Sequence, residues 1–141
     1  MKQRIHLDHI GIATPSLNLS TPFWELLGLI NVGDDELVLD QGVKTRFFST
    51  SELDENIKSP KIELLEPTAD NTPIGKFLVK KGPGVQQICF RVENLEQMIK
   101  TMLENDVIMI DELPRIGAGG KKIAFVHPKS TGGVLVELTQ Y

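Results

Sequence analysis

The strongest constraint on the fold is a weak internal repeat, in which the second half of the chain follows the first half's order of strand, helix and strands. Residues 7–10 (LDHI) align with residues 85–88 (VQQI) at an offset of 78, and residues 62–64 (IEL) align with residues 136–138 (VEL) at an offset of 74. Loops absorb the difference of four residues easily. Because each half has too few strands to bury both faces of its own sheet, we expect the two halves to fold together.

Hydrophobic periodicity predicts an α+β domain over residues 1–141, made of repeat halves at about 1–67 and 84–141, with a mostly antiparallel sheet. The expected strands are 5–13, 29–32, 36–39, 43–48, 61–65, 85–92, 107–110, 122–126 and 133–138. Helices are expected after Thr21 as N-cap, from residues 70–73 to about residue 81, and after Asn94 as N-cap. The polar stretch 49–59 is predicted to be a loop.

Composition bounds the function without naming it. The chain has 141 residues and a formal net charge of −4, which argues against a basic nucleic-acid-binding face. The single cysteine, Cys89, excludes an internal disulfide framework and is typical of a reducing cytoplasm. Apolar runs such as 107–110 are far too short to span a membrane. We therefore expect a cytoplasmic protein with neither a nucleic acid nor a membrane as partner.

Four polar residues occupy equivalent strand positions in the two halves, each within an apolar run: His9, Glu63, Gln87 and Glu137. A carboxylate that faces inward from a sheet is costly unless it is paired, protonated or bound to a metal. Imidazole, amide oxygen and two carboxylates form a ligand set that suits octahedral divalent ions such as Co, Ni, Mn, Fe or Mg. Alternatively, the two glutamates lie on a solvent-exposed face and His9 is a hydrogen-bonded structural histidine.

Several of these segments resemble one protein family. Residues 7–13 (LDHIGIA) resemble the opening of glyoxalase-fold proteins, the vicinal oxygen chelate superfamily. Residues 59–78, with KIELLEP and PIGKFL, and residues 111–138 are more specifically similar to the methylmalonyl-CoA epimerase family. The similarity covers essentially the whole chain.

The resemblance implies a glyoxalase-like fold: two βαβββ modules that form a curved, mostly antiparallel sheet around a central cavity, usually in a homodimer. It also implies a divalent metal ion (Co, Ni, Mn, Mg or Zn) and proton transfer at the α-carbon of an acyl-CoA thioester. A metal ion is a Lewis acid that stabilises a developing enolate oxyanion, and a carboxylate base removes and returns the proton.

Carried over residue by residue, the resemblance makes His9 and Glu137 metal ligands, with Glu63 where the family often has a glutamine. Gln87 stands where the family has a histidine, and an amide oxygen is a weaker, harder ligand than an imidazole nitrogen. Thr45 stands where the family has a glutamate base, and a hydroxyl is not basic at neutral pH. Its neighbours Lys44 and Arg46 either face solvent or meet an anionic group of the substrate.

The sequence therefore predicts an enzyme: a methylmalonyl-CoA epimerase-like isomerase acting on a short acyl-CoA thioester, with Glu137 as the catalytic proton acceptor. One alternative is a lyase of the glyoxalase I (lactoylglutathione lyase) type, which acts on a thiol adduct. Another is a protein that binds an acyl thioester or other small molecule without turning it over, because Gln87 and Thr45 depart from the family pattern.

Overall fold

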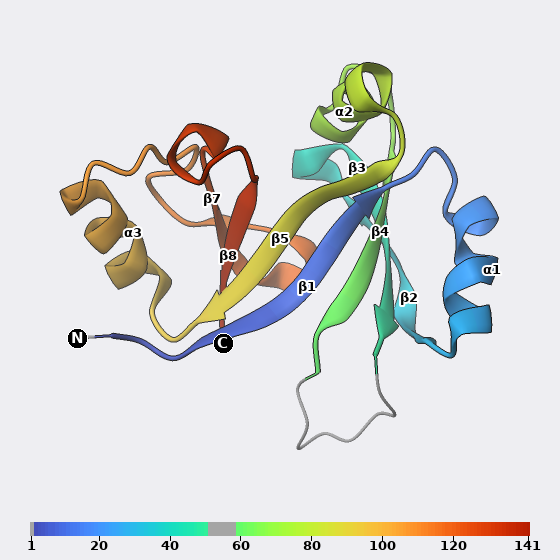
Figure 1. Ribbon diagram of the computed structural model, residues 1–141, viewed down its shortest axis with the longest axis horizontal. Helices are drawn as coiled ribbons and strands as arrows, with labels where there is room; N and C mark the ends of the chain where they lie inside the picture. Colours follow the sequence, from blue (N-terminus) through green and yellow to red (C-terminus); the bar gives the residue numbers. More distant parts are fainter. Residues whose placement is uncertain (1, 51–58) are drawn as a thin grey trace. The chain divides into compact units, whose positions relative to one another are not determined.

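The computed structural model describes residues 2–50 and 59–141, so residues 51–58 of the predicted 49–59 loop lie outside the described part. The described elements are β1 (Ile5–Ala13), α1 (Leu17–Leu27), β2 (Ile30–Val38), η1 (Leu39–Gln41), β3 (Val43–Ser49), β4 (Lys61–Pro67), α2 (Pro73–Lys81), β5 (Gly84–Val92), α3 (Leu95–Glu104), β6 (Arg115–Ile116), η2 (Ala118–Gly120), β7 (Lys122–Val126), η3 (Pro128–Ser130) and β8 (Val136–Gln140). Figure 1 shows the path of the chain.

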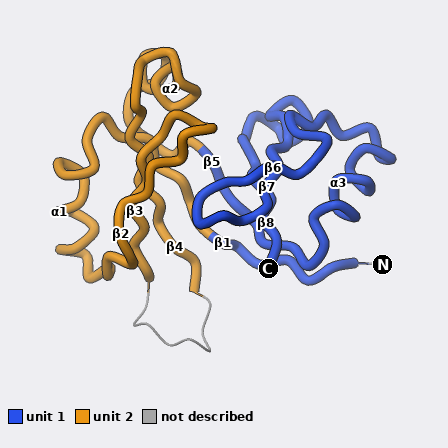
Figure 2. Tube along the Cα trace, turned by 180° about the vertical axis from the view of Figure 1, so that it is seen from behind, with its two compact units in different colours: residues 1–8, 87–141 blue, residues 9–86 orange. Residues whose placement is uncertain are grey.

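The chain divides into two compact units, which Figure 2 distinguishes by colour. Unit 1 contains residues 1–8 and 87–141, and unit 2 contains residues 9–86. In unit 2 the strand order is β2-β3-β4-β1, with β1 parallel to β4 and the other pairs antiparallel. In unit 1 the order is β5-β8-β7-β6, with β5 parallel to β8 and the other pairs antiparallel. The two units thus repeat the same strand topology.

One helix covers one face of the sheet in each unit (Figure 1). In unit 2, Leu17 of α1 packs with Phe48 and Leu64. In unit 1, Leu95 and Ile99 of α3 pack with apolar residues of β5, β7 and β8. Because side chains alternate along a strand, the neighbours of these core residues project from the opposite face. In each unit that opposite face carries two of the four predicted site residues.

The helix predicted after Thr21 begins earlier than expected. Ser16 is the N-cap of α1, where its hydroxyl accepts a 3.2 Å hydrogen bond from the amide of Leu19, and Pro22 lies inside the helix. The predicted cap Thr21 instead donates to the carbonyl of Leu17 at 2.7 Å. The extra turn forms because it places Leu17 in the core.

Other expected boundaries moved as well. The predicted strands 29–32 and 36–39 form a single strand, β2, whose register shifts between Val32 and Glu36. Residues 107–110 form only an isolated bridge, between Met109 and Val126. The pairing does not continue because the backbone amide of Phe125 donates to the side-chain carboxylate of Asp111. Asn94 is confirmed as the N-cap of α3, and the N-cap of α2 is Thr72. None of the helices within the described residues has the length and apolar character to cross a bilayer.

Candidate functional site

The first pair of predicted site residues lies in unit 2. His9, on β1, and Glu63, on β4, are 5% and 3% exposed, and His9 Nε2 lies 3.2 Å from Glu63 Oε1. The His9 ring also makes an edge contact with the ring of Phe47, at 5.5 Å between centroids. The interpretation of Glu63 as a residue on a solvent-exposed face is therefore wrong.

The second pair lies in unit 1 and has the same placement. Gln87, on β5, and Glu137, on β8, are 5% and 7% exposed. The amide Nε2 of Gln87 donates a 2.6 Å hydrogen bond to Oε2 of Glu137. The solvent-exposed interpretation of Glu137 is wrong as well.

The strand registers show that these two pairs are structurally equivalent. Glu63 lies opposite Gly11 in the parallel β1–β4 pairing, and Glu137 lies opposite Cys89 in the parallel β5–β8 pairing. Gly11 follows His9 by two residues on β1, just as Cys89 follows Gln87 by two residues on β5. The antiparallel neighbour is a phenylalanine in both units: Phe47 opposite Glu63, and Phe125 opposite Glu137.

The side chains of each pair include donor atoms that suit a divalent cation. Each buried pair offers one carboxylate, and its partner is an imidazole in unit 2 and an amide in unit 1. Two buried carboxylates are more readily accommodated with a cation than without one. The Gln87 amide uses its Nε2 for the hydrogen bond to Glu137. Its oxygen, Oε1, is the amide atom that ligates metals. Nitrogen and oxygen donors of this kind are typical of Mn, Co, Ni or Mg sites.

Thr45, which the resemblance predicted to replace a glutamate base, is buried in β3. Its exposed fraction is 2%, and within residues 2–50 and 59–141 no hydrogen-bond partner contacts its Oγ1. It pairs with Leu65 on β4, two residues from the Glu63 position, so it projects from the same face of the sheet as Glu63.

Arg46 neither faces solvent nor projects from the face that carries Glu63. Its guanidinium forms two 2.7 Å hydrogen bonds with the carboxylate of Asp35 and a 2.8 Å bond with Thr21 Oγ1. These bonds hold the pKa of Asp35 below its usual value, against a smaller opposing effect of burial. Lys44 is exposed, with its Nζ 4.0 Å from Asp35. Arg46 thus serves the packing of α1 against the sheet.

Sequence reasoning missed a buried ion pair in unit 1. Arg91, on β5, donates to Oδ1 of Asp8 from Nε at 2.9 Å and from Nη2 at 2.6 Å. Both side chains are buried, and the guanidinium carbon lies 5.1 Å from the centroid of the Tyr141 ring. Asp8 belongs to an alternating strand pattern, which predicts exposure, so only the fold reveals this pair.

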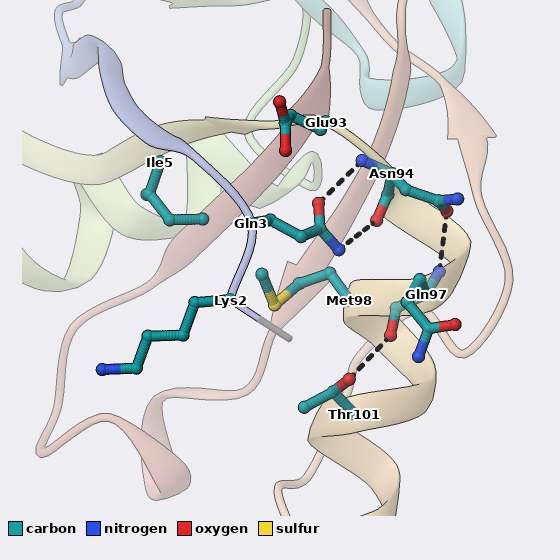
Figure 3. Close-up of a pocket in the computed structure, with 8 residues that line it drawn as sticks. All are labelled: Lys2, Gln3, Ile5, Glu93, Asn94, Gln97, Met98 and Thr101. Atoms are coloured by element: carbon teal, nitrogen blue, oxygen red, sulfur yellow. Dashed lines mark hydrogen bonds between the residues drawn. The ribbon is translucent and has the colours of Figure 1, made fainter.

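A pocket of about 840 Å³ lies at the start of α3, and none of the four predicted residues lines it (Figure 3). Its wall is closed by the Gln3 side chain, which accepts from the Asn94 amide at 2.7 Å and donates to the Asn94 carbonyl at 2.9 Å. Asn94 in turn caps the helix by accepting from the Gln97 amide. The two hydrogen bonds between Gln3 and Asn94 in Figure 3 therefore hold the N-terminal segment against the start of α3.

Comparison with known proteins identifies the family of the chain. The chain matches the family model of the Glyoxalase/Bleomycin resistance protein/Dioxygenase superfamily over residues 8–125. The mitochondrial methylmalonyl-CoA epimerase of Dictyostelium discoideum is 40% identical over 136 residues, which cover 95% of this chain and 77% of that protein.

The structure is also similar to solved structures of methylmalonyl-CoA epimerases. Methylmalonyl-CoA epimerase from Mycobacterium tuberculosis matches with a TM-score of 0.86 and 35% identity, covering 95% of this chain and 86% of that one. A Streptomyces coelicolor methylmalonyl-CoA epimerase variant in complex with 2-nitronate-propionyl-CoA matches with a TM-score of 0.87 and 32% identity, covering 96% and 93% of the two chains. The fold is therefore the glyoxalase-like fold that the sequence predicted.

Proposed function

Because the chain belongs to the Glyoxalase/Bleomycin resistance protein/Dioxygenase superfamily, we propose that it is a methylmalonyl-CoA epimerase-like isomerase acting on a short acyl-CoA thioester. The observation that carries the proposal is the equivalent placement of two buried polar pairs, His9 with Glu63 and Gln87 with Glu137. Relatives named as methylmalonyl-CoA epimerases, one of them solved with a propionyl-CoA derivative, support the substrate class.

In this proposal the four residues predicted from the sequence are ligands of a divalent ion. His9 contributes an imidazole nitrogen, Glu63 and Glu137 contribute carboxylate oxygens, and Gln87 contributes an amide oxygen. A divalent ion held there supplies Lewis-acid stabilisation of the negative charge that develops on the thioester oxygen.

Glu137 is the proposed proton acceptor. The C–H bond at the α-carbon breaks, the proton moves to a carboxylate oxygen of Glu137, and the bonding electrons pass into the thioester carbonyl as an enolate. Return of a proton to the same carbon restores the thioester. The 2.6 Å hydrogen bond from Gln87 restricts the rotation of the Glu137 carboxylate and so orients the base.

Thr45 favours a second candidate function. Inversion at the α-carbon needs a proton-transfer group on each face, and the Thr45 hydroxyl is not a base at neutral pH. The protein then either exchanges the α-proton from one face only, or binds an acyl thioester without turnover. The glyoxalase I-type lyase and the homodimer implied by the resemblance stay predictions, tested by turnover of a glutathione thiol adduct and by the mass of the protein in solution.

Metal analysis of the purified protein after incubation with Co²⁺ or Mn²⁺ tests the ligand set. We expect one ion per chain in the wild type, and loss of that ion in both Glu63→Gln and Glu137→Gln. Glu66→Gln is the matched control, because Glu66 lies on the same strand but accepts a hydrogen bond from the Leu17 amide on the α1 side. Failure of the wild type to take up either ion would favour the non-catalytic binding protein.

Deuterium incorporation from D₂O into methylmalonyl-CoA tests the chemistry directly. We expect exchange at the α-carbon by the metal-loaded wild type, and a loss of about 10²-fold or more in Glu137→Gln. Exchange should be faster than inversion, because one base serves one face. A metal-bound protein that shows no exchange would contradict the isomerase proposal and leave the lyase.

Introducing the family's residues at positions 87 and 45 tests whether these two positions limit inversion. The double variant Gln87→His with Thr45→Glu supplies the imidazole ligand and the second carboxylate of the family pattern. We expect inversion to approach the rate of exchange in this variant. If inversion stays slow although the variant binds metal and exchanges the proton, these two positions do not explain why inversion is slower than exchange.

A further inference from the structure

We propose that the Thr45 hydroxyl is a substrate-binding group, which forms a hydrogen bond with an oxygen of the acyl group. This inference rests on the proposed acyl-CoA substrate. The evidence is the environment of the Thr45 side chain. The residue is 2% exposed, yet within the described part of the chain its Oγ1 has no hydrogen-bond partner.

The direction of the Thr45 side chain follows from the register of β3. Arg46 and Phe48 project toward α1, as their contacts with Thr21 and Leu17 show. Strand alternation therefore places Thr45 and Phe47 on the opposite face. Phe47 lies directly across from Glu63, so Thr45 is a diagonal neighbour of Glu63. Such neighbours are about 7–8 Å apart, too far for direct contact but close enough for one small acyl group to reach both.

A buried hydroxyl without a partner is unfavourable for folding, so the fold alone gives no reason to keep it. Other buried threonines of this chain differ in that respect. The Thr139 hydroxyl donates to the Lys122 carbonyl at 3.2 Å, and the Thr14 hydroxyl donates to the Ser16 carbonyl at 3.0 Å. Valine has nearly the same shape and would fill the Thr45 site without the unsatisfied group.

The chemistry of the hydroxyl indicates what it binds. It carries one donor hydrogen, and the acyl group of a methylmalonyl-type thioester offers carboxylate and carbonyl oxygens as acceptors. At this position a hydroxyl binds and orients the acyl group without removing its proton. The CoA moiety makes no part of this contact, which gives the experiment an internal control.

Calorimetric titration of the metal-loaded protein with methylmalonyl-CoA, and separately with free CoA, measures the contact. We expect Thr45→Val to bind methylmalonyl-CoA about five- to tenfold more weakly, the value of one lost hydrogen bond, with the affinity for free CoA unchanged. Thr45→Ser keeps the hydroxyl and should retain the wild-type affinity. Thr45→Ala is the second variant and should lose affinity as Thr45→Val does.

Urea unfolding separates a binding role from a structural one. We expect the midpoint of Thr45→Val to equal or exceed that of the wild type, since no hydrogen bond of the free protein is lost. Thr139→Val is the matched control and should unfold at a lower midpoint, because its hydroxyl is bonded.

Two results would overturn the inference while leaving the proposed function intact: unchanged affinity of Thr45→Val and Thr45→Ala for methylmalonyl-CoA, or a drop in unfolding midpoint as large as that of Thr139→Val. A wild type that binds no methylmalonyl-CoA would overturn the proposed function together with the inference.

Discussion

Gln87 and Glu137, fifty residues apart in sequence, meet through a 2.6 Å hydrogen bond between neighbouring strands, with both side chains buried. The equivalent contact in the other unit joins His9 to Glu63 at 3.2 Å. The two contacts differ in one partner, an amide in place of an imidazole.

Replacing the amide with an imidazole is expected to strengthen metal binding. Gln87→His supplies a nitrogen ligand, so its affinity for Co²⁺ or Ni²⁺ should rise by roughly tenfold, at the low end of the changes seen around metal sites. Competition with a chromophoric chelator measures the affinity. Gln86→His is the control, because the neighbouring side chain projects from the other face of the strand. An equal rise in Gln86→His would show that Gln87 is not a ligand.

Divalent metal is expected to stabilise the folded chain. An ion that binds only the folded state adds about 2.7 kcal/mol to the free energy of unfolding at a hundred times its dissociation constant. Urea unfolding with and without Co²⁺ measures this gain, and EDTA should abolish it. Glu66→Gln should keep the gain, whereas Glu63→Gln and Glu137→Gln should lose it. Equal stabilisation of all three variants would place the ion elsewhere.

The buried ion pair of Asp8 with Arg91 predicts a large loss of stability when one partner is removed. Asp8→Asn leaves the buried guanidinium without its counter-charge, which should lower the free energy of unfolding by about 3 kcal/mol. The control is Glu93→Gln, which breaks the exposed pair of Glu93 with Arg4 and should have no measurable effect. Urea unfolding measures the free energy of unfolding of both variants. Losses of similar size would contradict the prediction that the buried pair of Asp8 with Arg91 contributes more than the exposed pair.

The pairing of Asp35 with Arg46 predicts a pH-dependent contribution to stability. The Arg46 hydrogen bonds lower the pKa of Asp35 in the folded protein below its ordinary value of 3.8. The contribution is therefore complete above pH 3.8 and is lost as the pH falls through the lower pKa of the folded state.

Asp35→Asn should consequently cost about 1 kcal/mol at pH 7, because the pair is partly exposed to solvent, and progressively less in acid below the ordinary pKa. Urea titrations at pH 7 and at several acid pH values test this. Asp34→Asn changes an exposed neighbouring carboxylate and serves as control. A pH-independent effect of Asp35→Asn would mean that lost packing, rather than the ion pair, is measured.

Much of the fold was predictable because its signals are local. Asn94 as N-cap predicted α3, and the structure has this cap, with Leu95 and Ile99 of the helix buried. The helix start at Ser16 was not predictable in this way. Ser16 and Thr21 are both good caps, and the choice between them depends on Leu17, whose partners Phe48 and Leu64 are distant in sequence.

The repeat, the strand periods and the four polar positions follow from the sequence alone, because these depend on residue spacing along the chain. The burial of Glu63 and Glu137 follows from the folded structure, since strand alternation does not say which face of a sheet is covered. The folded structure also decides the roles of two adjacent residues in β3. Arg46 is held by Asp35 on the α1 side, while Thr45 lies buried on the face of Glu63, because pleating sends neighbouring side chains in opposite directions.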